Sequence, residues 1–433
     1  YVTDVYPLGS QAGEETTFSL NGWNLAQTKF TRTIPEPGMH LVSSGMDGVA
    51  SNPVPISVDT VPEHLETEPN NSLDDAPQVG LPTIVNGRID RAGDIDVFCI
   101  DCRAGAEIVA EVYARRLGSS LDSVIKLMDA NGKQVAMNDD YEDKTAGLTT
   151  HHADSRLSAR IQRSGHYYLY LGDGQQQGGE AYSYRVHLRP LRPDFELRVV
   201  PSSVNARAAT TVPIAVHAMR KDGFDGDIVL GLHESPPGFV LSGGRIPAGY
   251  DIVRATLAVP SEATSPISLS LAGQALIQRR TVTRLAGAAD DMMQAFIYRH
   301  LVPAEDFQVA VTGAARRTGA MRVLTTQPVK IPVSGTVKVP VVIPTRSFFG
   351  DIQVELDNPP AGLSIESVAL GRQGSVIVLR SDADEIERGL KGNLIVEAFV
   401  ERSPRGQDGK PAGPPRRTAL GVLPAIRFEV VEG

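Results

Sequence analysis

The residues best suited to chemistry lie in the stretch ETEPNNSLDDAP, residues 66–77. Six of its side chains offer carboxylate or amide oxygens, and the four that are candidate ligands are Glu66, Glu68, Asn70 and Asn71. Calcium takes about six to eight such hard oxygen ligands. In an extended segment alternate residues point to one side, and Pro69 restricts its own backbone and that of the residue before it. We predict half of a calcium site here, and the alternative is a solvated acidic linker.

The other half of this site is predicted in RAGDIDVF, where Asp94 and Asp96 stand two residues apart at the start of an expected strand. This spacing places both side chains on one face of the strand. A fallback site is the acidic run NDDYED, whose oxygen-bearing residues are Asn138, Asp139, Asp140, Glu142 and Asp143. That run follows another expected strand, and an ordinary polar loop is its alternative.

A catalytic arrangement is suggested only by HHADSR, which contains His151, His152, Asp154 and Ser155. A nucleophilic triad needs a base within reach of the serine and an acid that orients the base, which neighbours in one loop rarely achieve. The sequence has no Gly-x-Ser-x-Gly elbow, no His-Glu-x-x-His and no phosphate-binding Gly-rich loop. We therefore predict a polar loop, no catalytic residues and no enzyme.

The two cysteines, Cys99 and Cys102, form a Cys-x-x-Cys pattern. Their surroundings favour a strand, in which positions three apart face opposite sides, so the thiols diverge and form no disulfide. Zinc would need further soft ligands. In GHYYLYLG, residues 165–172, the alternation favours tyrosines that fill a core over tyrosines that stack on a sugar.

The composition sets the expected fold class. A chain of 433 residues is too long for one core and predicts three or four domains. Gly (41) and Pro (30) are plentiful, and Val, Ile and Thr recur in short alternating runs. This mixture predicts an all-β, multidomain string of β-sandwiches, immunoglobulin-like and jelly-roll-like. The net charge of -9 argues against a nucleic-acid partner, because phosphate binding needs clustered Lys and Arg.

No apolar run approaches the roughly 20 residues that a membrane helix needs, so we predict no membrane insertion in this chain. The sequence begins with Tyr1 rather than Met. We therefore expect a trimmed or mature fragment, whose leader is not readable from it.

Turn signals divide the chain into four expected parts, which are a small immunoglobulin-like sandwich (1–60), a linker with a second sandwich (61–190), a third sandwich (191–290), and a connector with a fourth (291–433). Asn131-Gly132 is a strong two-residue hairpin signal in the second part. The connector ADDMMQAFIYRHLVP fits a short helix and a strand equally, and Pro303 ends it.

The last two parts resemble each other. GDIVLGLHESPPGFVL begins at Gly226, and GDIQVELDNPPAGLSI begins at Gly350. The two stretches align without gaps, and the turn positions that match are Pro236 with Pro360 and Gly238 with Gly362. An apolar strand that leads into a Pro-Gly turn, repeated at one offset, predicts two copies of one fold.

Residues 66–190 resemble the bacterial pre-peptidase C-terminal domain, a jelly-roll-like β-sandwich appended to secreted proteases and collagenases. The resemblance rests on ETEPNNSLDDAP, GRIDRAGDIDVFCIDCRAG, LDSVIKLMDANGKQVAMNDD, SGHYYLYLGDG and YSYRVHL. Calcium-binding members use the linker acids and amide with acids before the second strand. By position this implies Glu66, Glu68, Asn70, Asn71 and Asp96. Asp94 takes the role of the remaining acid by proximity only. The family's usual three-residue spacing between the two acids would place the other acid at residue 93, which is Gly here, and this departure leaves the number of ions open.

Residues 1–60 resemble an IPT/TIG-like module, and the last two parts have a generic immunoglobulin-like outline. From these resemblances we expect a non-catalytic adhesion or scaffold ectodomain that is secreted, periplasmic or on the cell surface, with calcium bracing the linker into the second sandwich. The alternative is a carbohydrate- or protein-binding module that targets a partner hydrolase to a polymer. The partner of such a module would be an extracellular polysaccharide or protein. A third hypothesis is a hydrolase with an unrecognised active site. The sequence predicts no oligomeric state.

Overall fold

The structure is a computed structural model that describes residues 1–25, 27–46, 49–141, 153–293, 299–314, 321–343, 352–371, 374–402 and 416–432. The described chain forms two compact units, the first ending at Arg192 and the second beginning at Pro193. Its regular structure is β throughout, apart from one turn of 3-10 helix, η1 (Arg115–Leu117). This confirms the predicted all-β, multidomain fold class.

The first module of unit 1 is a small two-layer sandwich. Its strands are β1 (Val2–Tyr6), β2 (Gly9–Gln11), β3 (Glu15–Gly22), β4 (Lys29–Thr33), β5 (Gly38–Val42), β6 (Gly45–Met46), β7 (Val49–Ala50) and β8 (Val54–Asp59). One sheet has the order β1-β3-β4 and the other β2-β8-β5. Phe18 is fully buried between them and stacks on Phe30 at 5.1 Å between ring centroids.

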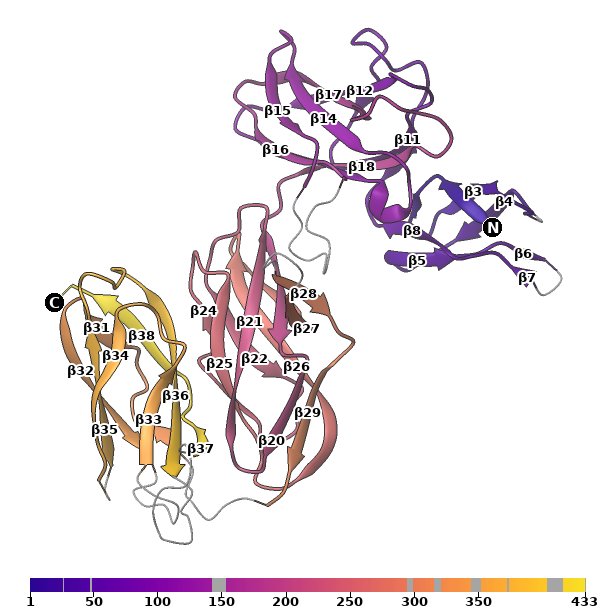
Figure 1. Ribbon diagram of the computed structural model, residues 1–433. Helices are drawn as coiled ribbons and strands as arrows, with labels where there is room; N and C mark the ends of the chain where they lie inside the picture. Colours follow the sequence, from indigo (N-terminus) through magenta and orange to yellow (C-terminus); the bar gives the residue numbers. More distant parts are fainter. Residues whose placement is uncertain are drawn as a thin grey trace. The chain divides into compact units, whose positions relative to one another are not determined.

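The second sandwich of unit 1 carries the predicted site. Its strands are β9 (Glu63–Leu65), β10 (Gln78–Val79), β11 (Thr83–Arg88), β12 (Ile95–Cys102), β13 (Glu107–Tyr113), β14 (Ser123–Asp129), β15 (Gln134–Asn138), β16 (Arg156–Arg160), β17 (Gly165–Asp173) and β18 (Ser183–Pro190). The sheets have the orders β10-β12-β17-β14-β15 and β16-β13-β18-β11-β9, and they form the two layers seen in Figure 1.

Alternation along β17 explains how this sandwich is filled. Tyr167, Leu169 and Leu171 point into the core, whereas Tyr168 and Tyr170 are half-buried on the opposite face. The prediction that the tyrosines fill the core is therefore right for Tyr167 and wrong for the other two, because a strand buries only every second side chain.

Other local predictions in this sandwich hold. The predicted hairpin at Asn131-Gly132 joins β14 to β15. Its loop is longer than the predicted two residues, and the hydrogen bond from the N–H of Asp129 to the carbonyl of Lys133 closes it. Cys99 and Cys102 are buried, free thiols in β12. Cys102 packs in the core, whereas Cys99 pairs across the sheet with Tyr168.

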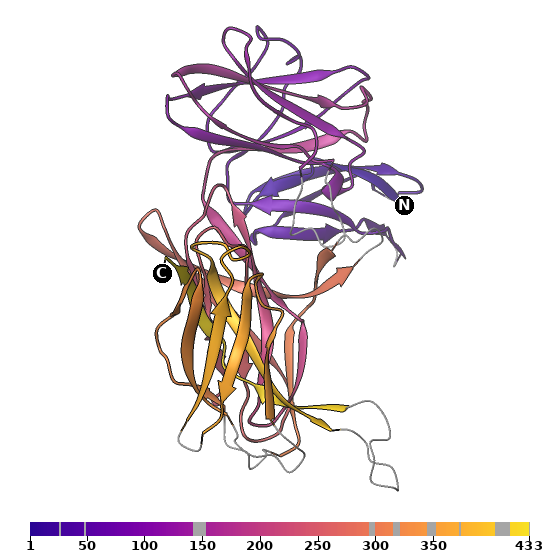
Figure 2. The same cartoon turned by 60° about the vertical axis from the view of Figure 1, so that its left-hand side comes forward.

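The two modules of unit 1 are joined by a buried ionic contact. Arg185 of β18 is fully buried and forms ion pairs with Asp59, at 3.2 Å, and with Glu63. Asp59 ends the first module, and Glu63 begins the second. The indigo module lies against the second sandwich in both views (Figures 1 and 2). A buried charge strongly destabilises the fold unless it is paired. The pairing of Arg185 with both modules therefore ties them together.

Unit 2 begins with a sandwich built from β19 (Asp194–Val200), β20 (Ser203–Arg207), β21 (Thr211–Lys221), β22 (Ile228–His233), β23 (Val240–Ser242), β24 (Arg245–Ile246), β25 (Ile252–Ala258), β26 (Thr264–Ile277), β27 (Arg280–Met293), β28 (Arg299–Pro303) and β29 (Phe307–Thr312). The predicted break at residue 290 falls inside β27. The connector is strand on both sides of residues 294–298, which lie outside the described residues. Strand β29 returns to pair with β20 and β26, so this sandwich extends to Thr312.

The last sandwich comprises β30 (Arg322–Val323), β31 (Val329–Pro332), β32 (Gly335–Val342), β33 (Ile352–Asp357), β34 (Leu363–Ala369), β35 (Ser375–Ser381), β36 (Lys391–Arg402), β37 (Arg416–Val422) and β38 (Ile426–Val431). The repeated stretches coincide with β22 and β33. Both turns place a glycine in the left-handed region, Gly238 at φ +93° and Gly362 at φ +76°, where a side chain is strained. Gly350, where the second copy begins, lies outside the described residues.

Candidate metal centre

The linker that carries the predicted ligands is held against the second sandwich by its backbone. The N–H of Glu66 donates to the carbonyl of Asn86 at 2.9 Å, beside β11. The carbonyl of Asn70 accepts from the N–H of Val97 at 2.8 Å, in β12. Between these anchors the Glu68–Pro69 peptide bond is cis. The linker therefore runs from one sheet to the other, and its side chains lie at the end of the sandwich.

Three carboxylates converge at this end. Glu66, Glu68 and Asp96 each offer an oxygen, and these oxygens lie within 4.8 Å of one another. Asp96 is fully buried near the start of β12, Glu66 is half-buried, and Glu68 is exposed. Like charges this close repel, so the group needs protons or a cation between its members.

The Asn70 side chain is buried among the same carboxylates. One of its terminal atoms lies 3.5 Å from Glu66 Oε2, and the other lies 3.1 Å from Asp96 Oδ1 and 3.3 Å from Glu68 Oε1. With the nitrogen toward Glu66, the oxygen faces two carboxylate oxygens, and either a carboxyl proton or a cation is needed there. With the amide reversed, the nitrogen donates to both carboxylates. The amide orientation therefore depends on what fills the centre.

Tyr184 of β18 closes the inner side of the group. Its hydroxyl lies 2.7 Å from Glu66 Oε2 and 2.6 Å from Asp96 Oδ2 and is fully buried. One hydroxyl has one proton, so it donates to only one of the two carboxylates. The second carboxyl must hold its own proton or be balanced by a cation.

Burial changes the acidity of these groups strongly. Desolvation, followed by the charge of Glu66, raises the pKa of Asp96 to about 9. Desolvation also raises the pKa of Glu66 to about 7, although hydrogen bonds from Tyr184 and from the N–H of Arg88 lower it. The pKa of Glu68 is raised by desolvation and, among other charges, by that of Asp94. In the absence of a cation, the centre therefore retains protons at neutral pH.

The donor set fits calcium. Glu66, Glu68, Asp96 and the amide oxygen of Asn70 are hard oxygens, and exposed Glu68 leaves one side open for the water ligands that calcium accepts. The absence of sulfur and imidazole from this group argues against zinc.

Asp94 and Asn71, the other two predicted ligands, lie beside this group and pair with each other. The amide of Asn71 donates to Asp94 Oδ1, and the N–H of Asp90 donates to Asp94 Oδ2 at 3.0 Å. Asp94 precedes β12, so the predicted strand parity with Asp96 does not apply to it. Of the six predicted ligands, four converge and two form a supporting pair.

Sequence reasoning missed two residues that shape this centre. Tyr184 lies in YSYRVHL and gave no signal of a contact with Glu66, which is 118 residues away. Gly87 lies in TIVNGRI, and a Cβ there would lie 2.3 Å from both Glu66 Oε2 and the Tyr184 hydroxyl. Glycine in this strand allows the close approach, a reason that the sequence alone hints at only weakly.

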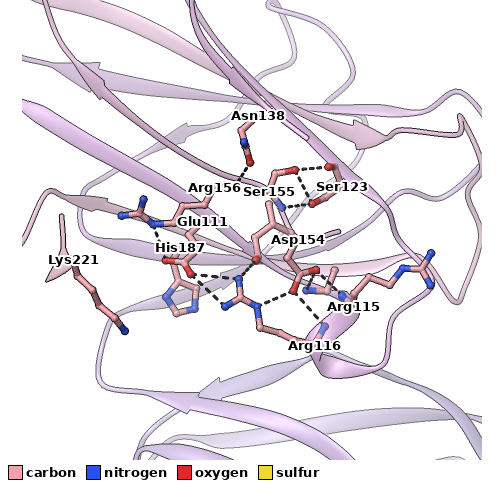
Figure 3. A network of polar contacts seen from close by, with 12 residues as sticks. Glu111, Arg115, Arg116, Ser123, Asn138, Asp154, Ser155, Arg156, His187 and Lys221 are labelled. Atoms are coloured by element: carbon pink, nitrogen blue, oxygen red, sulfur yellow. Dashed lines mark hydrogen bonds and ion pairs between the residues drawn. The ribbon is translucent and has the colours of Figure 1, made fainter. Parts of the chain in front are cut away.

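Asp154 and Ser155 of HHADSR are buried in a polar network, which Figure 3 shows in close-up. Asp154 accepts from the N–H groups of η1, including that of Arg115 at 2.6 Å, and from Arg116 Nε at 2.8 Å. The Ser155 hydroxyl lies 2.9 Å from that of Ser123. His151 and His152 lie outside the described residues. Both described members therefore have structural partners.

The fallback run NDDYED contributes no converging group among the residues that the structure describes. Asn138 uses its side chain locally, accepting from the N–H of Arg156 and donating to the carbonyl of Asp140, both at 2.7 Å. Asp139 and Asp140 are exposed. Glu142 and Asp143 lie outside the described residues.

Comparisons with known proteins give limited matches. No family model matches the chain. A probable subtilase-type serine protease of Deinococcus radiodurans is 33% identical over 105 residues, which is 24% of this chain and 13% of the relative. The chain thus spans a small part of that relative's length, and the match does not show a family.

Among solved structures, the pre-peptidase C-terminal domain of a Bacillus anthracis collagenase is 19% identical, covers 28% of this chain and all of that chain, and has a TM-score of 0.20. The D00-D0 domain of intimin is 12% identical, covers 54% of this chain and 99% of that chain, and has a TM-score of 0.17. These scores are too low to support an argument, so the family resemblance remains a prediction. Within the described residues, no helix is long and apolar enough to span a membrane.

Proposed function

We propose that this protein is a non-catalytic, extracytoplasmic scaffold or adhesion segment in which calcium braces the linker into the second sandwich. Glu66, Glu68, Asn70 and Asp96 would hold the ion. The observation that carries the proposal is the convergence of three carboxylates, whose oxygens lie within 4.8 Å of one another, around a single buried Tyr184 hydroxyl that lies within hydrogen-bond distance of two of them.

Calcium would act here as a cross-link. Glu66, Glu68 and Asn70 belong to the linker after β9, whereas Asp96 belongs to β12 of the other sheet. An ion bound by all four fixes the linker to both sheets. Because Arg185 ties the preceding module to the same sandwich, the ion would stiffen the whole of unit 1, which suits a spacer that carries load between a surface and a ligand.

Thermal unfolding of the full chain tests this proposal. We expect the transition of unit 1 to move to higher temperature in millimolar calcium than in chelator, with magnesium less effective because it keeps more of its water ligands. Equilibrium dialysis would count the ions. A midpoint that is the same in calcium and in chelator, with no ion retained, refutes the calcium brace and leaves only the β-sandwich scaffold.

A second candidate function is favoured by the protease relative. A module that targets a partner hydrolase to a polymer would bind an extracellular polysaccharide or protein. Pull-down of the full chain on insoluble matrix polysaccharides and on collagen tests this. Retention on one polymer supports targeting, and absence of retention on the whole panel favours the scaffold.

A further inference from the structure

A groove of about 670 Å³ lies on the outer face of the sheet that contains β12, β17, β14 and β15. The apolar side chains on this face are those of Ile95, Val124, Met137 and Tyr170. Ile95 and Met137 are exposed large hydrophobic residues, at 44% and 46%. This surface therefore offers apolar area where a sheet face without a ligand usually carries polar side chains.

The groove is hollow because of one glycine. Gly172 of β17 pairs with Ile95 on one side and with Val124 on the other, so the middle of the row has no side chain. A Cβ at Gly172 would have its nearest neighbours at 3.5 and 3.6 Å, which is ordinary contact distance. The space above this glycine is therefore open and would accept a larger residue.

The charges around the groove have one dominant sign. Five aspartates line it, Asp94, Asp122, Asp139, Asp140 and Asp173, against a single cation, Lys126. Asp94 and Asp173 are engaged in the fold, and Asp173 accepts the N–H groups of Asp122, Gln175 and Gln177. Within the described part of the chain, the Asp122 carboxylate accepts from Gln175 Nε2, at 3.3 Å. Asp122, Asp139 and Asp140 therefore offer negative charge to a ligand.

The spacing of these acids distinguishes the groove from the metal centre. Within the described part of the chain, Glu66, Glu68 and Asp96 are the group of acids whose oxygens converge within 4.8 Å. The groove acids form no such group. Carboxylates spread along an apolar floor fit several separate ammonium or guanidinium groups better than one small ion.

We propose that this groove binds a polypeptide segment that carries lysine or arginine side chains. The aliphatic stems of these side chains pack on Met137 and Val124, and the Tyr170 ring offers an aromatic surface to a cation. Their charged ends pair with Asp139 and Asp140 on the rim. This proposal goes beyond the calcium brace and does not depend on it, and it assigns a partner class to the second candidate function.

Fluorescence anisotropy of the full chain with labelled extended peptides tests the groove. One peptide alternates lysine with small apolar residues, and a matched one carries glutamate in place of lysine. Two variants probe charge and shape separately: Asp139→Asn with Asp140→Asn lowers the rim charge, and Gly172→Val fills the hollow at constant charge. The control, Asp101→Asn with Glu107→Gln, removes the same charge from exposed sites outside the groove.

We expect the lysine peptide to bind and the glutamate peptide not to bind. The double rim variant should weaken binding about tenfold, the effect of two exposed ion pairs near the upper end of their range. Gly172→Val should weaken binding at least as much, and the control by less than about twofold. Binding should weaken as salt is added. Unchanged thermal midpoints verify that the variants fold.

Three outcomes would overturn the proposal. These are no binding of the lysine peptide, equal losses in the rim and control variants, and full binding by Gly172→Val, which would indicate unspecific attraction to an acidic surface. Retention of a neutral oligosaccharide that Gly172→Val abolishes would assign the groove to sugars instead. Parallel titrations in calcium and in chelator test the two proposals separately. If calcium does not shift the midpoint but the lysine peptide still binds, the calcium proposal fails and the groove proposal stands.

Discussion

Replacement of Asp96 by asparagine separates a metal centre from a merely structural polar cluster, because the two roles predict opposite effects. Asparagine has the shape of aspartate but no charge. As a calcium ligand, Asp96 supplies the buried negative charge, so Asp96→Asn should abolish the response to calcium. In chelator no cation offsets the burial of this acid, so the same substitution should stabilise the protein, whereas removal of an ordinary structural acid should destabilise it in both buffers.

The response to calcium has a calculable size. An ion that binds only the folded state at about 100 times its Kd adds ~2.7 kcal/mol. A domain of roughly 150–250 residues shifts its Tm by about 2–4 °C per kcal/mol, so unit 1 of the wild-type chain should rise by about 5–11 °C. Asp96→Asn should show almost none of this shift. Asp101→Asn, an exposed substitution later in β12, should keep all of it.

The effect in chelator follows from the pKa of about 9 for Asp96. This folded-state pKa is above the unfolded-state value, so between about pH 4 and 9 the folded state binds a proton that the unfolded state does not, and stability falls as the pH rises. Asparagine removes this cost. Even one pKa unit of the increase corresponds to about 1.4 kcal/mol, so Asp96→Asn should melt about 3–5 °C higher at about pH 8.

Differential scanning calorimetry of the full chain in calcium and in chelator measures both effects. The reasoning fails if Asp96→Asn lowers the midpoint equally in both buffers, because Asp96 would then be an ordinary structural acid. It fails equally if Asp96→Asn retains the wild-type response to calcium.

Three further predictions concern the surroundings of this centre. Gly87→Ala should lower the stability of the protein by about 1–3 kcal/mol, because a Cβ would lie 2.3 Å from Glu66 and Tyr184. It should also reduce the rise in Tm that calcium causes. Gly80→Ala, whose Cβ would meet open space, should do neither in the same melts. Burial, then the charge of Arg185, lowers the pKa of His187 to about 3. Between about pH 3 and 6.5 the unfolded chain therefore binds a proton at His187 that the folded protein does not bind. The free energy of unfolding should fall on acidification by up to ~1.4 kcal/mol per pH unit. His187→Gln should flatten this slope in urea titrations while exposed His64→Gln leaves it, and equal slopes would contradict the assignment. Asp154→Ala should lower the free energy of unfolding in urea by about 3–5 kcal/mol, because it removes a carboxylate partner of half-buried Arg116. A decrease below about 1 kcal/mol would show that Glu111 alone pairs this cation adequately.

The sequence predicted most of the strands of the second sandwich because each is a local pattern. The alternation in GHYYLYLGD places Leu169 and Leu171 in the core directly. The convergence of Glu66, Glu68 and Asn70 was also foreseen, because alternate residues of one extended segment share a side. What failed needed knowledge of distant pairing. The prediction of a break at residue 290 missed β29, which returns to pair with β20 about a hundred residues earlier in the chain.

The same limit explains the other differences at the centre. The parity argument for Asp94 assumed a strand that begins before it, but a turn holds Asp94, whose N–H bonds the carbonyl of Arg91 at 3.1 Å. The contact of Tyr184 with Asp96 depends on how the two sheets stack, which no local pattern encodes. Tyr170 was assigned to a core because alternation predicts two faces but does not say which one is covered.

Among the acids that the structure describes in unit 1, the donors around Asp154, Asp173 and Asp96 favour Asp96 as the place where a cation would bind. Asp154 accepts from three backbone N–H groups and from the guanidinium of Arg116. Asp173 accepts from three backbone N–H groups. Those charges are therefore already compensated by protein donors. Among the described residues, the partners of Asp96 are the hydroxyl of Tyr184, which is shared with Glu66, the Glu66 carboxyl, and whichever amide atom Asn70 presents. A buried carboxylate with so few donors gains most from an added positive charge, so calcium should bind at Asp96 before it binds at any other acid that the structure describes in unit 1.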